Sequence, residues 1–125
     1  AEVVDVSFLN SPGVYKIRDI KNDKSYYGET NLLNRRFMHH FQGLQNDTHD
    51  CRALATAFKQ QNKEIENFRF LVHKSGPEWE DKNLRLEYES QLINNNQHWS
   101  YNTEQEKPTF LRVQKSVMYE GTLYR

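Results

Sequence analysis

The sequence predicts an α/β (α+β) fold, a small three-stranded and mainly antiparallel sheet flanked by helices. Two observations carry this prediction. Residues 13–28, GVYKIRDIKNDKSYYG, contain two strand-like runs on either side of a turn-like insert. Residues 31–45 and 80–96 repeat apolar residues at the three- and four-residue spacing of a helix. Strands and helices that alternate along one chain of 125 residues are accommodated most simply by helices packed on a single sheet.

The first two strands are expected at Val14 to Ile20 and at Ser25 to Glu29, because both runs are rich in β-branched residues and tyrosine. Between them, residues 21–24 read Lys-Asn-Asp-Lys. The Asn-Asp centre suits a tight turn, so the two runs should form a β-hairpin.

The first helix should follow at once, with Thr30 or Asn31 as its N-cap and its end near Gln45. At 100° per residue, four apolar side chains of this helix fall on one arc. They are expected to face the core: Leu33, Phe37, Phe41 and Leu44.

The remaining elements are predicted from composition and periodicity. A second helix is expected at 51–61, a third strand at 67–74 and a third helix at 80–96. Two β-like pieces, TFLRV and VMYEGTLYR, lie in the tail after residue 103. The expected order is therefore β, β, α, α, β, α, followed by an irregular end.

The composition argues against a membrane-spanning protein and against a domain held together by disulfides. Seventeen basic and seventeen acidic residues cancel, and no apolar run is long enough to cross a bilayer. The single cysteine, Cys51, cannot form an intrachain disulfide. We therefore expect one globular domain with no membrane partner, located inside the cell in the cytoplasm or an organelle.

Two arginine–histidine pairs in the first helix point in different directions. Arg36 and His40 lie four residues apart on the shoulder of the apolar arc, whereas Arg35 and His39 lie on the solvated side. Arg36 and His40 are the better candidates for a site. A histidine beside an apolar arc is more often only a hydrogen-bonded residue at the edge of the core.

Glu89 is the unexpected residue of the third helix. The inward arc is predicted to consist of Leu84, Leu86, Tyr88, Leu92 and Ile93, and Glu89 falls on it. A carboxylate in such surroundings is costly unless it is paired, hydrogen-bonded or bound to a cation. Arg85, four residues earlier, could pair with it within the helix, and we give this alternative about even weight.

These features together resemble the GIY-YIG nuclease family. Its first motif corresponds to Gly13-Val14-Tyr15, and its second, ten residues on, corresponds to Tyr26-Tyr27-Gly28. The arginine of the following helix corresponds to Arg36, and in the intron-encoded or phage-type homing endonucleases of this family two histidines correspond to His40 and His49. The metal-binding glutamate corresponds to Glu89, and a closing asparagine to Asn102.

The resemblance covers residues 12–102 and implies a metal-dependent DNA endonuclease of the homing or mobile-element type. It would hydrolyse phosphodiester bonds and leave 5′-phosphate and 3′-hydroxyl ends. It implies one Mg²⁺ or Mn²⁺ ion per active site, bound by Glu89. Arg36 would contact the scissile phosphate, and Tyr15, assisted by Tyr26 and His40, would accept the proton of the attacking water. His49, Asn102 and Arg35 would contact the substrate.

The implied partner is double-stranded DNA, with a transient dimer or a fused recognition domain as additional expectations. We divide the chain into a nuclease domain at 1–102 and a tail at 103–125 that packs on it or leads to a recognition region. Either Tyr15 or His40 could act as the base, since His40 is mostly neutral near pH 7 while a phenol needs its pKa lowered. The alternatives are a non-cutting DNA- or protein-binding module, or a restriction or repair nuclease.

Overall fold

The computed structural model describes residues 10–102, so the two strand-like pieces predicted in the tail lie outside the described residues. Three strands form the sheet, β1 (Gly13–Asp19), β2 (Lys24–Thr30) and β3 (Phe68–Ser75). β1 is central and pairs antiparallel with both neighbours, so the order is β2-β1-β3. The predicted antiparallel three-stranded sheet is confirmed.

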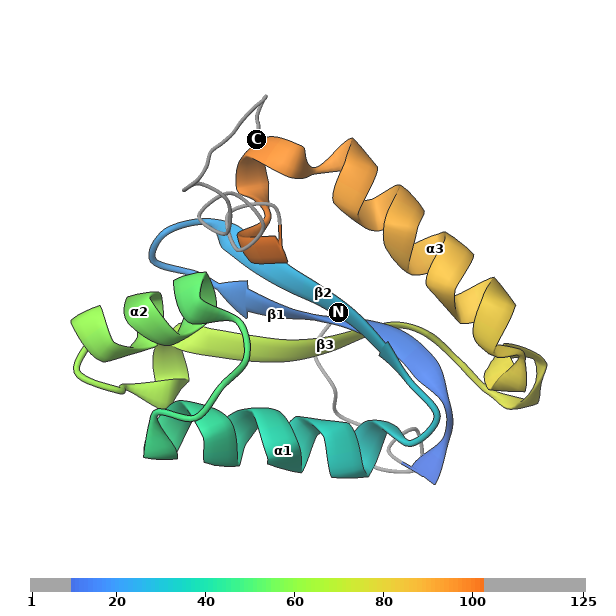
Figure 1. The fold of residues 1–125 in the computed structure, drawn as a ribbon, viewed down its shortest axis with the longest axis horizontal. Coiled ribbons are helices and arrows are strands. Elements are labelled where there is room, and N and C mark those ends of the chain that lie inside the picture. Colours follow the sequence, from blue (N-terminus) through green and yellow to red (C-terminus); the bar gives the residue numbers. More distant parts are fainter. Residues whose placement is uncertain (1–9, 103–125) are drawn as a thin grey trace, which may run out of the picture.

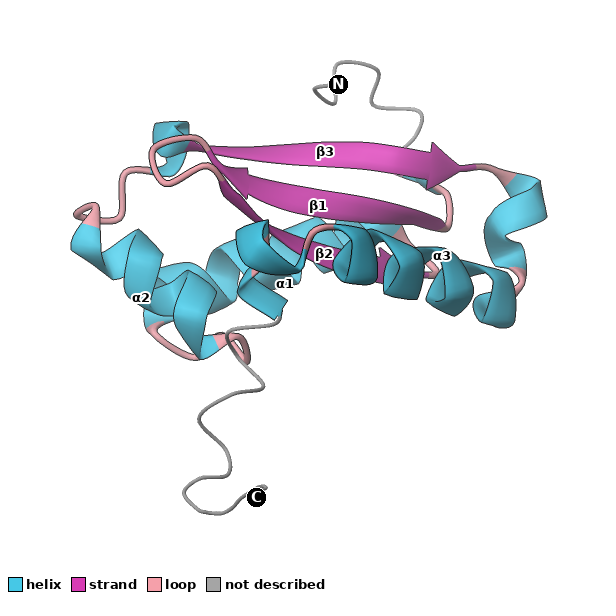
Figure 2. Ribbon diagram, turned by 90° about the horizontal axis from the view of Figure 1, so that it is seen from above, coloured by secondary structure: helices cyan, strands magenta, loops and turns pink. Residues whose placement is uncertain are grey.

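Three α-helices pack on this sheet, α1 (Leu33–Asn46), α2 (Arg52–Gln60) and α3 (Lys82–Asn95). In the view of Figure 1, α1 and α2 lie along one side of the sheet and α3 runs along the other. Figure 2 shows the helices gathered nearer to β2 than to β3. Short 3₁₀ turns complete the chain at Ile65–Asn67, Pro77–Glu80 and Gln97–Trp99. None of the helices in the described part is long and apolar enough to cross a membrane.

The main core lies between the sheet and the α1–α2 pair. Tyr15 and Ile17 of β1 pack there against buried side chains from both helices and from β3, which include Leu33, Leu44, Leu54, Phe58 and Phe68. The opposite side of the sheet is covered by α3 and contains a ring cluster of Tyr27, His73 and Tyr88. The residues of β1 therefore alternate between two different environments.

The inward face of α1 differs from the prediction by one residue. Leu33 and Leu44 are buried as expected and Phe37 packs against the core, but Phe41 is 41% exposed. His40 is buried in its place. The expected cap is also wrong, because Leu32 occupies the N-cap position and no side chain caps the helix. Thr30 instead accepts a hydrogen bond from the backbone N–H of Leu32.

The inward face of α3 is more polar than predicted. Leu84 and Leu86, expected to face inward, are each 39% exposed, whereas Arg85 is buried. The covered side of the helix follows positions 85, 88, 89, 92 and 93, which recur at the three- and four-residue spacing of one helical face. Glu89 belongs to this face, as predicted, but its neighbour one turn earlier is an arginine.

Candidate active site

The hairpin brings the two tyrosine-glycine motifs together across neighbouring strands. Tyr15 of β1 is directly opposite Gly28 of β2, and Ile17 is opposite Tyr26, so both phenols lie on the same face of the sheet. A Cβ atom added to Gly28 would lie 2.4 Å from the hydroxyl oxygen of Tyr15. A glycine is therefore required at this position, because the phenol occupies the space of a side chain.

Arg36 and His40 extend from α1 to the same phenol. The Nε–H of Arg36 donates a hydrogen bond of 3.3 Å to the hydroxyl oxygen of Tyr15. Nε2 of His40 lies 2.5 Å from that oxygen. The four-residue spacing of Arg36 and His40 places both side chains over the hairpin, one helical turn apart.

His49 continues this chain of hydrogen bonds from the loop between α1 and α2. Its Nε2 lies 2.6 Å from Nδ1 of His40, and its Nδ1 accepts the backbone N–H of Cys51 at 2.9 Å. The two imidazole rings are stacked, with centroids 4.8 Å apart. The turn that brings His49 back to α1 passes through Asp47, whose φ of 63° ends the helix in the left-handed conformation.

The backbone N–H of Cys51 determines which ring nitrogen carries the proton in each histidine of this hydrogen-bond chain. Since Nδ1 of His49 accepts, a neutral His49 carries its proton on Nε2 and donates it to Nδ1 of His40. A neutral His40 then carries its proton on Nε2, which donates to Tyr15. The phenol oxygen thus accepts two N–H groups, one from His40 and one from Arg36. This is the arrangement that stabilises a phenolate.

The pKa values of His40 and Tyr15 are shifted mainly by burial. Burial, then the neighbouring His49, Arg36 and His39, lower the pKa of His40 to about 2, so the ring is neutral at physiological pH. Burial also raises the pKa of Tyr15 above its usual value, and the opposing effect of Arg36 is smaller. Arg36 by itself therefore does not bring the pKa of Tyr15 below its usual value.

Tyr26 lies on the open side of the same cluster. Its ring meets His40 edge-on at a centroid distance of 5.2 Å and His49 at 5.9 Å. Burial raises its pKa, and Arg36 partly opposes this. Tyr26, Arg36, His40 and His49 line one cavity of about 300 Å³. The hairpin therefore places both phenols beside His40, on one face of the sheet.

Glu89 of α3 lies close enough to this cluster to raise the pKa values of Tyr15 and Tyr26, and it lacks a hydrogen-bond or ion-pair partner among the described residues. It makes no hydrogen bond or ion pair with another residue of the described segment 10–102. Arg85 is engaged elsewhere: its Nε lies 2.8 Å from Oε1 of Glu29, and its Nη1 donates to the carbonyls of Trp79 and Glu80. The alternative in which Arg85 neutralises Glu89 is therefore wrong.

The charge of Glu89 is poorly compensated. Its side chain is half-buried, and burial together with the nearby Glu29 raises its pKa to about 7, against the smaller effect of Arg36. A carboxylate held in this condition suits a bound cation, which favours the ionised form. Within residues 10–102 no group of three or more His, Cys, Asp or Glu side chains could hold a metal. A single carboxylate fits Mg²⁺, which keeps several waters and needs few protein ligands.

Comparison with known proteins identifies the family. A family model for the GIY-YIG catalytic domain matches residues 11–102. The chain belongs to the GIY-YIG family.

Solved structures agree with this assignment. The catalytic domain of the homing endonuclease I-TevI is 26% identical, with a TM-score of 0.62 over 73% of this chain and 96% of that one. A variant of the catalytic domain of the intron endonuclease I-TevI is also 26% identical, with a TM-score of 0.61 over 72% and 90% of the two chains. No curated protein sequence matches. The predictions of a GIY-YIG fold and a GIY-YIG-type endonuclease are confirmed.

Two of the predicted substrate contacts lie away from the phenol of this GIY-YIG domain. Arg35 is exposed on α1 and donates to Oδ1 of Asn31 at 2.9 Å. The amide of Asn102 bonds the backbone of Tyr27 twice, with Oδ1 accepting the N–H at 2.8 Å and Nδ2 donating to the carbonyl at 2.9 Å. The third, His49, lines the central cavity and is also hydrogen-bonded to His40.

Sequence reasoning missed the ion pair between Glu29 and Arg85, although it borders the site. Both side chains line a cavity beside Arg36. Their positions differ by 56 residues, and only the packing of α3 on β2 brings them together. The available signal was indirect: an arginine one turn before Glu89 on the same helical face needs an acceptor of its own.

Proposed function

We propose that this GIY-YIG domain is a metal-dependent endonuclease that hydrolyses phosphodiester bonds of double-stranded DNA. The products would carry 5′-phosphate and 3′-hydroxyl ends, and the mobile-element type is favoured by the similarity to I-TevI. The observation that supports the proposal best is the phenol of Tyr15. Its oxygen accepts N–H groups from His40 and Arg36, and the unpartnered carboxylate of Glu89 lies near enough to influence its pKa.

In this proposal Tyr15 is the general base and His40 is a donor that supports it. Both nitrogens of His40 are engaged, one accepting from His49 and one donating to Tyr15, so His40 has no free lone pair for water. Tyr15, once deprotonated, would accept a proton from the water that attacks phosphorus. The two N–H donors would offset part of the cost of forming the phenolate in a buried position.

Arg36 would serve both the phenol and the phosphate. Tyr15 is fully buried, so water reaches its oxygen only when a covering side chain moves. Arg36 lies over that oxygen and is half-exposed, and a guanidinium binds phosphate oxygens strongly. We infer that the scissile phosphate draws Arg36 toward itself and opens the path to the phenol.

Glu89 would hold one Mg²⁺ or Mn²⁺ ion per site. The bound cation supplies positive charge for the phosphate and for the leaving 3′ oxygen. Glu89 is a half-buried carboxylate near the cluster with no hydrogen-bond or ion-pair partner among the described residues, whereas the neighbouring Glu29 is paired with Arg85. The same pairing holds α3 on β2 and so sets the position of Glu89.

The proposal also covers the domain division and the way in which the chain associates with DNA. A domain at 1–102 with a tail at 103–125 is consistent with the family match to 11–102. The chain as a whole has no net charge, which disfavours tight binding to DNA without help. A fused recognition domain or transient pairing of two copies on DNA would supply that help.

A nicking assay tests the proposal. Wild type should relax supercoiled plasmid with Mg²⁺ and be inert in EDTA. Glu89→Gln should abolish cutting because it removes the cation ligand. Arg36→Ala should reduce the rate by about 100- to 1,000-fold, as for the loss of one preorganised donor at a developing charge.

Glu87→Gln is the matched control, because Glu87 is an exposed carboxylate on the same helix. It should cut like wild type. Wild type that is inert on every DNA tested would favour the non-cutting binding module. Cutting by Glu89→Gln at the wild-type rate would show that the site is wrongly assigned.

A further inference from the structure

The cavity lined by Tyr26, Arg36, His40 and His49 is the middle one of three cavities that lie along α1. On one side it shares Arg36 and His39 with a cavity of about 460 Å³. On the other side it shares Thr48 and His49 with a cavity of about 620 Å³. Neighbouring cavities share lining residues, so the three adjoin one another along α1, with Arg36 and His40 lining the middle one. We call this row of cavities the groove.

The length of the groove suits a polynucleotide strand. α1 has 14 residues, which corresponds to about 21 Å at 1.5 Å per residue. Successive nucleotides of one strand in B-form DNA rise by about 3.4 Å, so the groove could accommodate about six of them. A single phosphate or a small metabolite would fill only part of it.

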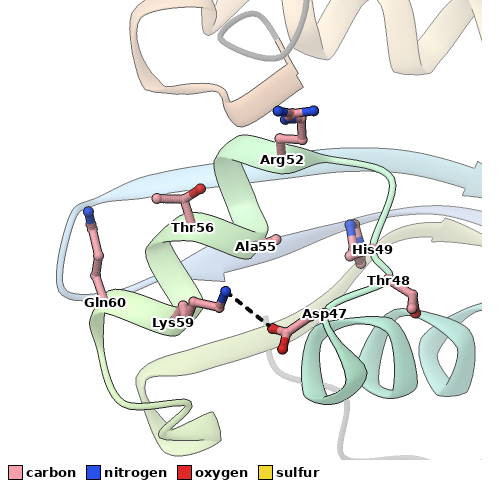
Figure 3. Close-up of a pocket in the computed structure, with 8 residues that line it drawn as sticks. All are labelled: Asp47, Thr48, His49, Arg52, Ala55, Thr56, Lys59 and Gln60. Carbon is pink, nitrogen blue, oxygen red and sulfur yellow. Dashed lines mark ion pairs between the residues drawn. The ribbon is translucent and has the colours of Figure 1, made fainter.

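Each end of the groove carries two exposed cations outside the catalytic cluster. Arg35 of α1 and Lys82 at the start of α3 line the end beside Arg36. Arg52 and Lys59 of α2 line the other end. Figure 3 shows this second end between α2 and the loop after α1, with Arg52 at the beginning of the helix and Lys59 close to its end.

The cations of the second end are available to a ligand. The side chain of Arg52 makes no hydrogen bond or ion pair with another residue in the described part of the chain. Lys59 lies 3.8 Å from Asp47, but both side chains are more than half exposed, so the pair is weak. Asp47 is also held by Lys63 at 3.3 Å, which leaves Lys59 free to exchange partners.

We propose that this groove binds the sugar-phosphate backbone of the cleaved DNA strand, with Arg52 and Lys59 holding phosphates on one side of the scissile bond and Arg35 and Lys82 on the other. The inference rests on the proposed endonuclease function. Lys and Arg contacts to phosphate carry no base information, so the groove sets the position of the strand and not its sequence. In a chain without net charge, these clustered cations supply the local attraction.

Salt dependence of binding tests the groove. The probe is a fluorescently labelled duplex of random sequence, bound by the full chain in EDTA over a range of salt concentrations. Each lost phosphate contact should reduce the slope of log K against log salt by about 0.9. The double variant Arg52→Ala/Lys59→Ala should therefore lower it by about 1.8. Arg35→Ala/Lys82→Ala should lower it equally.

The matched control is Lys21→Ala/Lys74→Ala, which removes two exposed lysines outside the groove. Its slope should equal that of wild type, and unfolding curves should confirm that all variants are folded. An unchanged slope for Arg52→Ala/Lys59→Ala, in a protein that binds and cuts DNA, overturns the groove while leaving the nuclease intact. Equal losses in the control overturn it too. Wild type that neither binds nor cuts DNA refutes the endonuclease itself.

Discussion

Acidic groups at and around the two ends of β1 have pKa values that are shifted in opposite directions. At one end, the carboxylate of Asp19 is fully buried and accepts hydrogen bonds from Tyr101, Gln61 and Asn22. Burial acts to raise its pKa, but these donors together hold the pKa below its usual value. At the other end, burial prevails, and the pKa values of Tyr15 and Glu89 rise.

The difference separates a structural cluster from a functional one. Both ends combine acidic side chains with polar neighbours, so burial alone does not distinguish them. What differs is whether the protein itself satisfies the charge. Asp19 is stabilised as an anion by its own fold, whereas Glu89 and a phenolate at Tyr15 need a cation or a substrate to complete their surroundings.

The largest effect is expected at the Tyr15 end. Tyr15→Phe removes the hydroxyl and keeps the ring, so it should reduce plasmid nicking by about 100- to 10,000-fold, the range for loss of a general base. Stability should fall by about 1–3 kcal/mol, because the ring packing remains but the buried Nε2–H of His40 loses its acceptor. Tyr101→Phe is the matched control, since its hydroxyl bonds Asp19 and not the catalytic cluster. It should lose stability and retain cutting in the folded protein.

The Asp19 end should respond in stability. Asp19→Asn replaces an acceptor oxygen that bonds three side chains and should cost about 3 kcal/mol, since hydrogen bonds to charged groups contribute about 1.5–3 kcal/mol each. Urea denaturation measures this. Because the folded pKa is depressed, the gap from wild type should be full above the unfolded pKa and close as the pH falls through the folded value.

Asp23→Asn is the control for that measurement, because Asp23 lies in the same hairpin turn and forms an exposed pair with Arg18. It should be nearly neutral, and its φ of 56° suits asparagine as well as aspartate. An equal loss in both variants would show that the hairpin responds to any change of charge.

A smaller loss of activity is expected for His49. His49→Ala removes the donor that fixes the proton of His40, so His40 can adopt the tautomer that no longer donates to Tyr15. Cutting should fall by about ten- to 100-fold. This loss does not exceed about 100-fold, the smallest loss expected for a residue that transfers the proton itself. An intact rate would mean that the histidine chain is only structural.

The smallest effect concerns the pH dependence of stability at Glu89. Its folded pKa of about 7 lies above the unfolded value of 4.5, so ionisation is costlier in the folded state. In EDTA, wild type should lose stability relative to Glu89→Gln as the pH rises from 4.5 to about 7, and the two should be equal below this window. Equal urea midpoints at every pH would show that Glu89 is already well compensated.

Local patterns predicted the strands well and the helix faces less well. Every strand boundary was predicted to within one residue, because alternation and turn residues are local properties. The inward faces of α1 and α3 depend on partners elsewhere in the chain. His40 is buried in preference to Phe41 because Tyr15 and His49 bond it, and Arg85 is buried because Glu29 pairs with it.

The candidate site divides in the same way. Tyr15, Tyr26, Arg36 and His40, which the helical pattern and the resemblance to the GIY-YIG family singled out, lie together. Their relative roles could not be predicted, because the tautomer of His40 depends on a backbone N–H at Cys51 that reaches it through His49. The position of Asn102 likewise required the folded chain, since its amide bonds a strand 75 residues away.

The two hydrogen bonds of Asn102 also have a consequence for association. β2 is an outer strand, and Tyr27 would otherwise offer its free N–H and C=O to a strand of a neighbouring molecule. Exposed strand edges of this kind promote edge-to-edge pairing of sheets and thus aggregation. The amide of Asn102 occupies the backbone N–H and C=O of Tyr27, and a short parallel bridge joins Ser25 to Ser100. Together they cover the part of β2 through which two copies of the protein could pair edge to edge.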